Sequence, residues 1–400
     1  MPPSSKRIRG LRLFLFLKDV ALLSFTCFGG PQAHLAVFQR LLVRDRAYIS
    51  DEELLELHAL CQMLPGPTST QTLTAIAFRI GGPNLAYLAL LIWILPSVLV
   101  MTTVALCLNL FERRNLSLEF TRYLQPIAVG LVAQSAYTFA RKTIFGNLDA
   151  GLMLLAAGLT YFFPTPYLSP LLIFFGGAVT AIRFRRRHQQ LDKEPFQIQW
   201  ANFALWIGVF LVAAGLGAIT HSLPVRLFEN FYRNGSLIFG GGQVLIPLLY
   251  NEFVQFKDYL TGQEFLFGYA LTQSLPGPVF AFCSYIGVLS CRSLGWQGQI
   301  AGAVGSTLGI FLPGTFLIFF IIRFWEQLKR YRVVKASLEG VNAISSGLVW
   351  AAALLMFKPL EADDATVLAI GGTFILLQFT KVPAWAIILV GLLAGIFIKP

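Results

Sequence analysis

The chain has 400 residues, of which 56% are hydrophobic and only 13% are charged. A soluble globular domain carries about a quarter charged residues, so this composition excludes an ordinary soluble enzyme or binding domain. The formal net charge of +11 would suggest nucleic acid in a soluble protein, but here the basic residues form short clusters beside apolar runs. Membrane topology and anionic lipid headgroups explain such clusters better, so we expect a lipid bilayer and no nucleic acid as partner.

Apolar segments recur along the whole chain and predict an all-α polytopic membrane protein, because they are continuous and lack the alternation of barrel strands. The first half contains about six such elements, centred near residues 20, 65, 97, 132, 156 and 175. The second half contains six more, centred near residues 237, 278, 309, 347, 371 and 390. We therefore divide the chain into an N-terminal repeat at 11–182, a basic linker with a connecting helix at 183–222, and a C-terminal repeat at 223–400.

Two short motifs recur at one spacing and show that the halves are copies of one unit. A Pro-Gly-Pro triplet, the glycine cluster before it and an intervening glutamine all return 211 residues later. The two sets are Gly29, Gly30, Pro31, Gln62, Pro65, Gly66 and Pro67, and Gly240, Gly241, Gly242, Gln273, Pro276, Gly277 and Pro278. Paired helix-breaking motifs inside apolar segments are typical of a transporter's binding site.

The orientation of the two copies depends on how many elements cross the bilayer. If all six elements of a copy cross, the connecting helix at 200–220 inverts the second copy relative to the first. With the N-terminus in the cytoplasm, the basic clusters at 183–187 and 323–335 then both lie on the cytoplasmic side, whereas several other basic residues lie outside, namely Arg40, Arg44, Arg46, Arg113, Arg114 and Arg122. Re-entrant Pro-Gly-Pro elements would change this parity, but we expect inverted repeats.

The first Pro-Gly-Pro predicts a candidate anion site. Proline lacks an N–H and suits the first turn of a helix, so we expect a new helix to begin at Thr68. Its first turn presents the polar residues Thr68, Ser69, Thr70 and Gln71 beside unpaired backbone N–H groups and the positive end of the helix dipole. Because the second copy has apolar residues from Val279 onward, we expect the first copy to supply most of the ligands.

Several of these features also have purely structural explanations. A Pro-Gly-Pro triplet can be a simple kink, and glycine clusters can serve helix packing. His34 and His58 are more often structural than proton-carrying, and Arg79 either lies in the anion pathway or snorkels to the interface. Glu53 follows Ser50 by three positions, as Glu264 follows Thr261, which predicts two helix-capping boxes.

Taken together, the motifs resemble those of the chromate transporter family in its long, two-domain form. The matching segments are Phe28-Gly29-Gly30-Pro31 with His34, Cys61 to Thr68, Phe239 to Val244 with Gln243, and Gln273 to Pro278. The resemblance covers practically the whole chain. It implies two oppositely oriented halves and efflux of chromate across the cytoplasmic membrane, which confers chromate resistance. It further implies sulfate as the related oxyanion and no cofactor.

We therefore expect a secondary transporter of a tetrahedral oxyanion. A sulfate transporter and a passive anion channel are the alternatives. A membrane-embedded reductase is disfavoured, because the sequence has no metal-ligand cluster, cofactor fingerprint or cysteine pair. A homodimer stays open. The candidate substrate-binding residues are Gly29, Gly30, Pro31, His34, Gln62, Pro65, Gly66, Pro67, Thr68, Ser69, Gln71, Arg79, Gly240, Gly241, Gly242, Gln243, Gln273, Pro276, Gly277 and Pro278.

Overall fold

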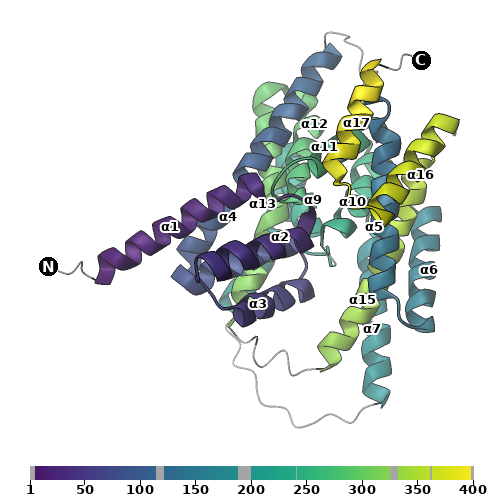
Figure 1. Ribbon diagram of the computed structural model, residues 1–400. Helices are drawn as coiled ribbons and strands as arrows, with labels where there is room; N and C mark the ends of the chain where they lie inside the picture. The colour runs from purple at the N-terminus through teal and green to yellow at the C-terminus, as the bar shows by residue number, and fades with distance from the viewer. Residues whose placement is uncertain are drawn as a thin grey trace.

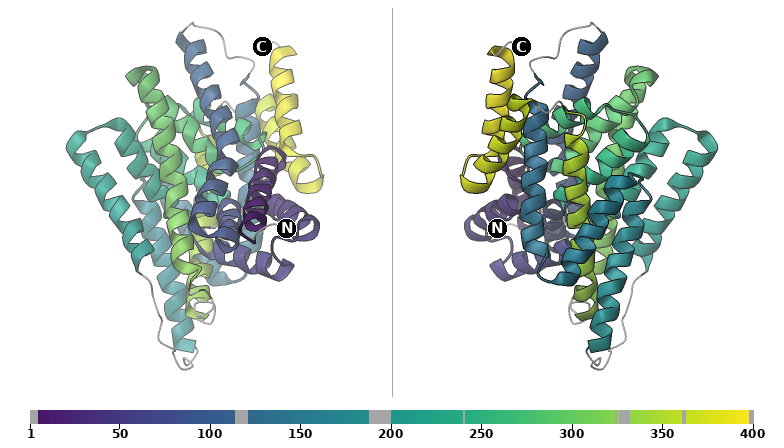
Figure 2. Two further views of the ribbon diagram at one scale, coloured as in Figure 1. Left: turned by 90° about the vertical axis from the view of Figure 1, so that its left-hand side faces the viewer. Right: turned by 90° about the vertical axis from the view of Figure 1, so that its right-hand side faces the viewer.

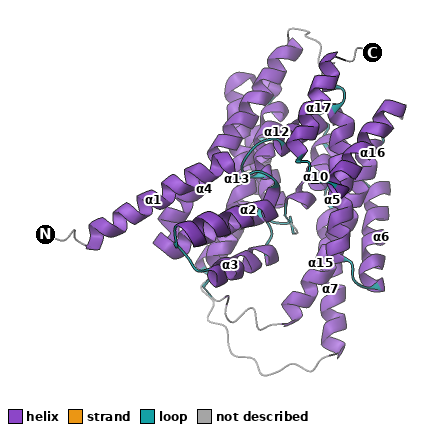
Figure 3. Ribbon diagram, in the orientation of Figure 1, coloured by secondary structure: helices purple, strands orange, loops and turns teal. Residues whose placement is uncertain are grey.

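The computed structural model describes residues 5–113, 121–187, 200–239, 241–323, 325, 332–360 and 363–397. Within these ranges the chain consists of helices joined by short loops and contains no strand (Figure 3). Gly240 and residues 188–199, which make up most of the polar linker, lie outside the described residues.

The first repeat contains α1 (Ser5–Thr26), α2 (Gly30–Phe38), the π-helical turn η1 (Gln39–Asp45), α3 (Asp51–Met63), α4 (Thr68–Arg113), α5 (Leu124–Thr143), α6 (Asn147–Phe162) and α7 (Leu168–Arg187). The connecting helix is α8 (Ala201–Thr220). The second repeat contains α9 (Leu223–Gly235), α10 (Gly242–Tyr250), η3 (Asn251–Phe256), α11 (Gly262–Gln273), η4 (Val279–Ala281), α12 (Phe282–Ser290), η5 (Arg292–Leu294), α13 (Gly295–Ile321), α15 (Arg332–Phe357), α16 (Asp364–Phe379) and α17 (Ala384–Phe397).

The helices of the two repeats correspond in order and run in opposite directions. In Figure 1, α5 and α7 descend along the chain, whereas their counterparts α15 and α17 ascend. The helix α8 stands at the edge of the bundle (Figure 2), where only Ala213 and Gly217 of its residues are buried. This arrangement is that of an inverted repeat with an extra helix between its halves.

Four helical segments among the described residues are long and apolar enough to cross a membrane, namely Thr68–Phe111, Ala201–Thr220, Arg292–Ile321 and Ala336–Phe357. The element expected near residue 65 is two helices, α3 and α4, which are separated at the Pro-Gly-Pro. The 13 residues of α3 span about 20 Å, which is too short for a hydrocarbon core of about 30 Å. The short helices α2, α3, α10 and α11 therefore end within the protein.

The repeats interleave instead of standing side by side. Helices α6 and α7 of the first repeat pack against α15 of the second. At the crossing of α7 and α15, a Cβ atom on Gly340 would collide with the carbonyl oxygen of Gly176. Small residues allow this close approach of two backbones, which substitutes for the hydrophobic effect between helices in lipid.

Each repeat ties the segment after its short helix α2 or α10 to the preceding helix with an ion pair, in which only the basic residues Arg46 and Lys257 occupy equivalent positions. In the first repeat, Asp19 of α1 pairs with Arg46 at 3.1 Å and accepts a hydrogen bond from Tyr48 at 2.7 Å. In the second, the fully buried Glu252 lies 2.6 Å from Arg233 and 2.8 Å from Lys257. These pairs hold η1 and η3 against α1 and α9.

Candidate functional site

The two Pro-Gly-Pro triplets each end one helix and begin another. As predicted, α3 and α11 begin with the capping boxes at Ser50 and Thr261, and α4 begins at Thr68 directly after Pro67. Gly66 and Gly277 have φ values of +123° and +94°, a left-handed region in which a Cβ atom is strained. The glycine between the prolines is thus required by the backbone conformation.

Reciprocal backbone hydrogen bonds join the two breaks across the repeats. The N–H of Gly66 donates to the carbonyl oxygen of Ile238 at 2.8 Å, and the N–H of Gly277 donates to that of Cys27 at 2.8 Å. Cys27 and Ile238 occupy equivalent positions, just before the two glycine clusters. Each Pro-Gly-Pro is therefore held by the segment that leads into the other repeat's glycine cluster.

A cavity of about 760 Å³ lies where these segments meet, and we call it the inter-repeat cavity. Both repeats contribute to its wall. The polar and glycine residues that line it are Gly29, Gly30, His58, Gln62, Thr68, Gln134, Ser135, Thr138, Lys142, Thr143, Gly241, Gly242, Gln243, Tyr269, Gln273 and Asn342.

Three helices begin at the wall of this cavity: α2 at Gly30, α10 at Gly242 and α4 at Thr68. The cap residues of α2 and α10, Gly29 and Gly241, have φ values of +92° and +83° and provide no side-chain hydrogen bond to the first turn. Helix N-termini carry partial positive charge and free N–H donors, so they favour an anion in the space between them. The left-handed glycines make these abrupt helix starts possible.

Of the three candidate residues in the first turn of α4, one lines the cavity. Thr68 lines the cavity, whereas the hydroxyl of Ser69 lies 3.1 Å from His34 Nδ1 and the amide of Gln71 donates to the carbonyl oxygen of Pro65 at 2.7 Å. Ser69 points about 100° away from Thr68, whereas Gln71 lies only about 60° from Thr68 and its amide is instead engaged by the carbonyl oxygen of Pro65. Ser69 and Gln71 instead hold the broken segment in place.

Several of the remaining candidate residues also do not line the cavity. His34 is buried behind the wall, where it packs edge-on against Trp93 at 5.4 Å. Arg79 is exposed on α4, about 16 Å along the helix from Thr68, and does not line the cavity. The prolines and glycines of both triplets do not line the cavity, and Pro31 lies in the first turn of α2.

The sequence motifs missed the wall that α5 provides. Gln134, Ser135, Thr138 and Lys142 all line the cavity, and Lys142 is the one fixed cation among its described lining residues. These residues recur at helical spacing along an apolar segment, and such a polar stripe in a membrane helix indicates a pathway or a binding site. This polar stripe is the sequence feature from which the contribution of α5 could have been predicted.

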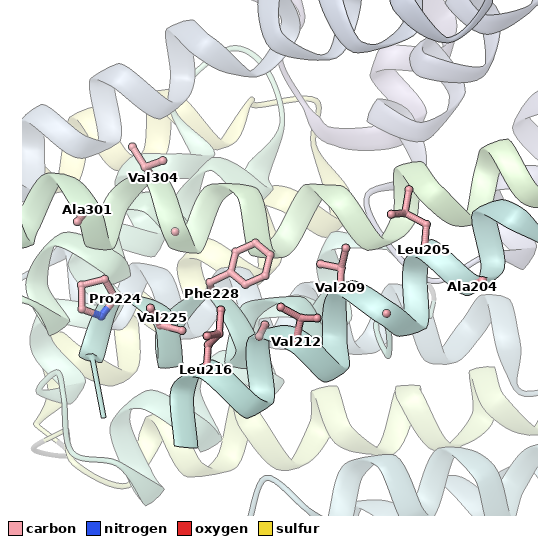
Figure 4. Close-up of a pocket in the computed structure, with 13 residues that line it drawn as sticks. Ala204, Leu205, Val209, Val212, Leu216, Pro224, Val225, Phe228, Ala301 and Val304 are labelled. Carbon is pink, nitrogen blue, oxygen red and sulfur yellow. The ribbon is translucent and has the colours of Figure 1, made fainter. Parts of the chain in front are cut away.

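Two other pockets differ from the inter-repeat cavity in chemistry. A pocket of about 720 Å³ between α8, α9 and α13 is lined by apolar residues such as Val209, Phe228 and Val304 (Figure 4). A smaller pocket of about 260 Å³ includes Arg226 and Lys257, but Glu229 lies beside them. Neither combines residues of both glycine clusters, so the inter-repeat cavity is the candidate site.

The sequence profile of chromate transporters matches residues 13–182 and 225–396, which include both halves of the cavity. This chain belongs to the chromate transporter family. A probable chromate transport protein of Synechococcus elongatus is 24% identical over 92% of this chain and 91% of its own length. A chromate transport protein of Pseudomonas aeruginosa is 25% identical over 93% and 89%, and one of Cupriavidus metallidurans is 24% identical over 93% and 90%. No solved structure matches the chain.

Family and fold together establish the general class of the protein. It is an integral membrane protein of the plasma membrane, and it is a transporter, not an enzyme. Its two matched segments coincide with the two sets of helices that meet at the cavity.

Proposed function

We propose that the protein is a secondary transporter that carries a tetrahedral oxyanion, most directly chromate, through the inter-repeat cavity. One observation carries the proposal. Both repeats bring a glycine cluster, a glutamine and a helix N-terminus to the same polar cavity. The names of the relatives support chromate over other oxyanions, with sulfate as the chemically related alternative.

The wall of the cavity offers donors that suit an oxyanion. Thr68 has a hydroxyl without a hydrogen-bond partner among the described residues, and Gln62 and Gln273 place their amide groups at the wall. Lys142 adds one positive charge. A dianion must be neutralised or heavily hydrogen-bonded before it can leave water for a low-dielectric site, and this set of donors and partial charges meets that need.

The inverted repeats supply a means of alternating access. Two equivalent halves with opposite orientation can exchange conformations, and the cavity then opens to one side of the membrane or the other. The reciprocal bonds of Gly66 and Gly277 join the two halves, and we propose that such an exchange turns about them. We propose efflux as the physiological direction, which would confer chromate resistance.

The test is the flux of labelled chromate into proteoliposomes that contain the Thr68→Val variant. Valine has nearly the shape of threonine and is the residue that the second repeat has at Val279. Loss of one hydrogen bond to a charged ligand should weaken apparent affinity about tenfold. The control Thr103→Val removes an exposed hydroxyl from the same helix and should change nothing. Unchanged flux in Thr68→Val would contradict the site.

Counterflow distinguishes a transporter from a channel. Unlabelled chromate on the opposite side of the membrane should accelerate the entry of labelled chromate, because a loaded carrier returns faster than an empty one. A passive channel would show no such acceleration, and that result would contradict secondary transport.

A further inference from the structure

One titratable side chain in the inter-repeat cavity has no part in the chemistry above. His58 and Gln62 lie one turn apart on α3, and both line the cavity. His58 Nε2 is 3.0 Å from Gln62 Nε2, and His58 Nδ1 is 3.1 Å from Thr72 Oγ1. Both ring nitrogen atoms therefore have a polar neighbour: Nδ1 contacts Thr72 of α4, and Nε2 contacts Gln62 at the cavity wall.

These contacts determine which ring nitrogen carries the proton. The hydroxyl of Thr72 donates its single proton to the carbonyl oxygen of Thr68 at 2.8 Å, so its oxygen accepts from the N–H at His58 Nδ1. Nε2 then holds the lone pair of a neutral ring and accepts from the NH2 group of Gln62. While His58 is neutral, it therefore accepts a hydrogen bond from the NH2 group of Gln62. The amide oxygen of Gln62, which repels anions, is then the atom available to the cavity.

We propose that protonation of His58 turns the Gln62 amide and thereby couples one proton to each oxyanion, an inference that rests on the proposed function. When Nε2 takes a proton from water in the cavity, it becomes a donor and can no longer accept from an NH2 group. The amide rotates, its oxygen accepts from Nε2–H, and its NH2 group faces the cavity as an anion donor. Departure of the anion reverses both changes and returns the proton to water.

The charges of the cavity agree with this coupling. Lys142 is the one fixed cation among the described lining residues, so it balances half the charge of a dianion. Protonated His58 balances the other half, and a neutral assembly is far less costly to hold in a low-dielectric site than a net charge. Proton and dianion therefore bind with positive cooperativity.

Other titratable groups around His58 do not replace it. Lys142 and Tyr269 line the same cavity, and Cys61 on its own helix lies near Thr72. Among the described side chains of the elements packed against α3, the charged ones are exposed and do not line the cavity, and they are Arg40, Arg44 and Asp45 of η1 and Arg79 of α4. Burial lowers the pKa of His58 below the ordinary histidine value of about 6.5. A dianion in the cavity favours the charged ring and raises that pKa, so His58 is the group among these whose protonation depends on the bound anion.

The second repeat provides an internal comparison. Tyr269 occupies the position of His58 and is hydrogen-bonded to Gln273, the equivalent of Gln62, and to Ser135. In both repeats the equivalent glutamine thus contacts the residue four positions before it on the same helix. A tyrosine at that position, however, gains no positive charge at any ordinary pH. Only the first repeat contains the proton-dependent form, which predicts one coupled proton per cycle.

Proton uptake on binding of sulfate or chromate to the purified full chain in weak buffer tests the inference. Sulfate is the main probe because it stays a dianion near neutral pH, whereas chromate itself takes up a proton. Wild type should take up about one proton per bound anion, and on the alkaline side of the histidine titration its affinity should fall about tenfold per pH unit. His58→Tyr and His58→Gln should bind the anion with no proton uptake and a flat pH profile.

Two further variants separate coupling from folding. Gln62→Met keeps the histidine but removes the amide, so affinity should fall and lose most of its pH dependence. His221→Asn replaces a histidine at the end of α8, where asparagine tolerates the left-handed φ of +52°, and it should couple as wild type does. Anion binding by wild type without proton uptake, or undiminished uptake in His58→Gln, would overturn the coupling while leaving the proposed function in place. Absence of any oxyanion binding by wild type would contradict both.

Discussion

The backbone N–H of Gly66 donates to the carbonyl oxygen of Ile238, and Gly277 makes the reciprocal bond to Cys27, each at 2.8 Å. Each repeat thus stabilises the broken helix of the other with a backbone group that side-chain substitution cannot remove. The bonds tie the Pro-Gly-Pro triplets to the segments just before the glycine clusters, which line the inter-repeat cavity. Geometry at the two glycines should therefore control the cavity.

Alanine at either glycine should impair both folding and transport. A Cβ atom at Gly66 would lie 2.8 Å from Gln71 Nε2, and one at Gly277 would lie 2.9 Å from Ser97 Oγ. The positive φ at each site adds a cost of about 1–2 kcal/mol. We expect Gly66→Ala and Gly277→Ala to lower the melting temperature by several degrees and to reduce chromate flux at equal membrane expression. The measurements are a thermal melt in detergent and flux in proteoliposomes.

The matched control is Gly158→Ala in α6. No atom lies within 4 Å of a Cβ at that position, and alanine favours a helix over glycine by about 1 kcal/mol. This variant should be at least as stable as wild type. Equal behaviour of Gly66→Ala and Gly158→Ala would contradict the role given to the triplet.

Neutralising the cavity cation should weaken anion binding. Lys142→Gln removes the one fixed positive charge among the described lining residues, and we expect the apparent affinity for chromate to fall about tenfold. Lys142→Arg should retain most of the affinity. Since the group is exposed, the difference between wild type and Lys142→Gln should shrink as salt rises. Isothermal titration with chromate measures both effects, and Lys358→Gln, an exposed lysine outside the cavity, is the control.

The buried carboxylate of the second repeat should be essential for stability. Glu252 contacts Arg233 at 2.6 Å, Lys257 at 2.8 Å and the amide of Asn234 at 2.7 Å. Glu252→Gln leaves two cations without their shared partner, which should cost roughly 3–5 kcal/mol. The exposed Glu52→Gln should cost almost nothing. Thermal melts compare the two, and similar melting temperatures would disprove a stabilising role for the cluster.

Close packing between the repeats should not tolerate a methyl group. At Gly340 an added Cβ would collide with the backbone of Gly176, whereas at Gly371 it would meet no atom within 4 Å. Gly340→Ala should therefore force α7 and α15 apart and lower the melting temperature, and Gly371→Ala should not. If both variants melt alike, the interleaved arrangement of α7 and α15 is wrong.

The sequence predicted those features that depend on local chemistry. Paired Pro-Gly-Pro motifs located both helix breaks, Pro67 placed a helix start at Thr68, and Ser50 and Thr261 marked the two capping boxes, all of which the structure confirms. These features follow from missing N–H groups, a fixed proline φ and short-range capping, so they need no tertiary information.

The rotation of a helix and its neighbours could not be predicted in the same way. Thr68, Ser69 and Gln71 are all polar, and only packing against His34 and the carbonyl of Pro65 decides that Thr68 alone lines the cavity. Lys142 joins the site because α5, a helix of the first repeat, packs against helices of the second repeat, a relationship that motif spacing does not contain.

The most direct measurement of the central claim is an experimental structure with chromate bound, in which the anomalous signal of chromium locates the ion. We expect one chromium site in the inter-repeat cavity, within hydrogen-bonding distance of Thr68 and the amide of Gln62. A chromium peak between Arg226 and Lys257, with no peak in the inter-repeat cavity, would contradict it.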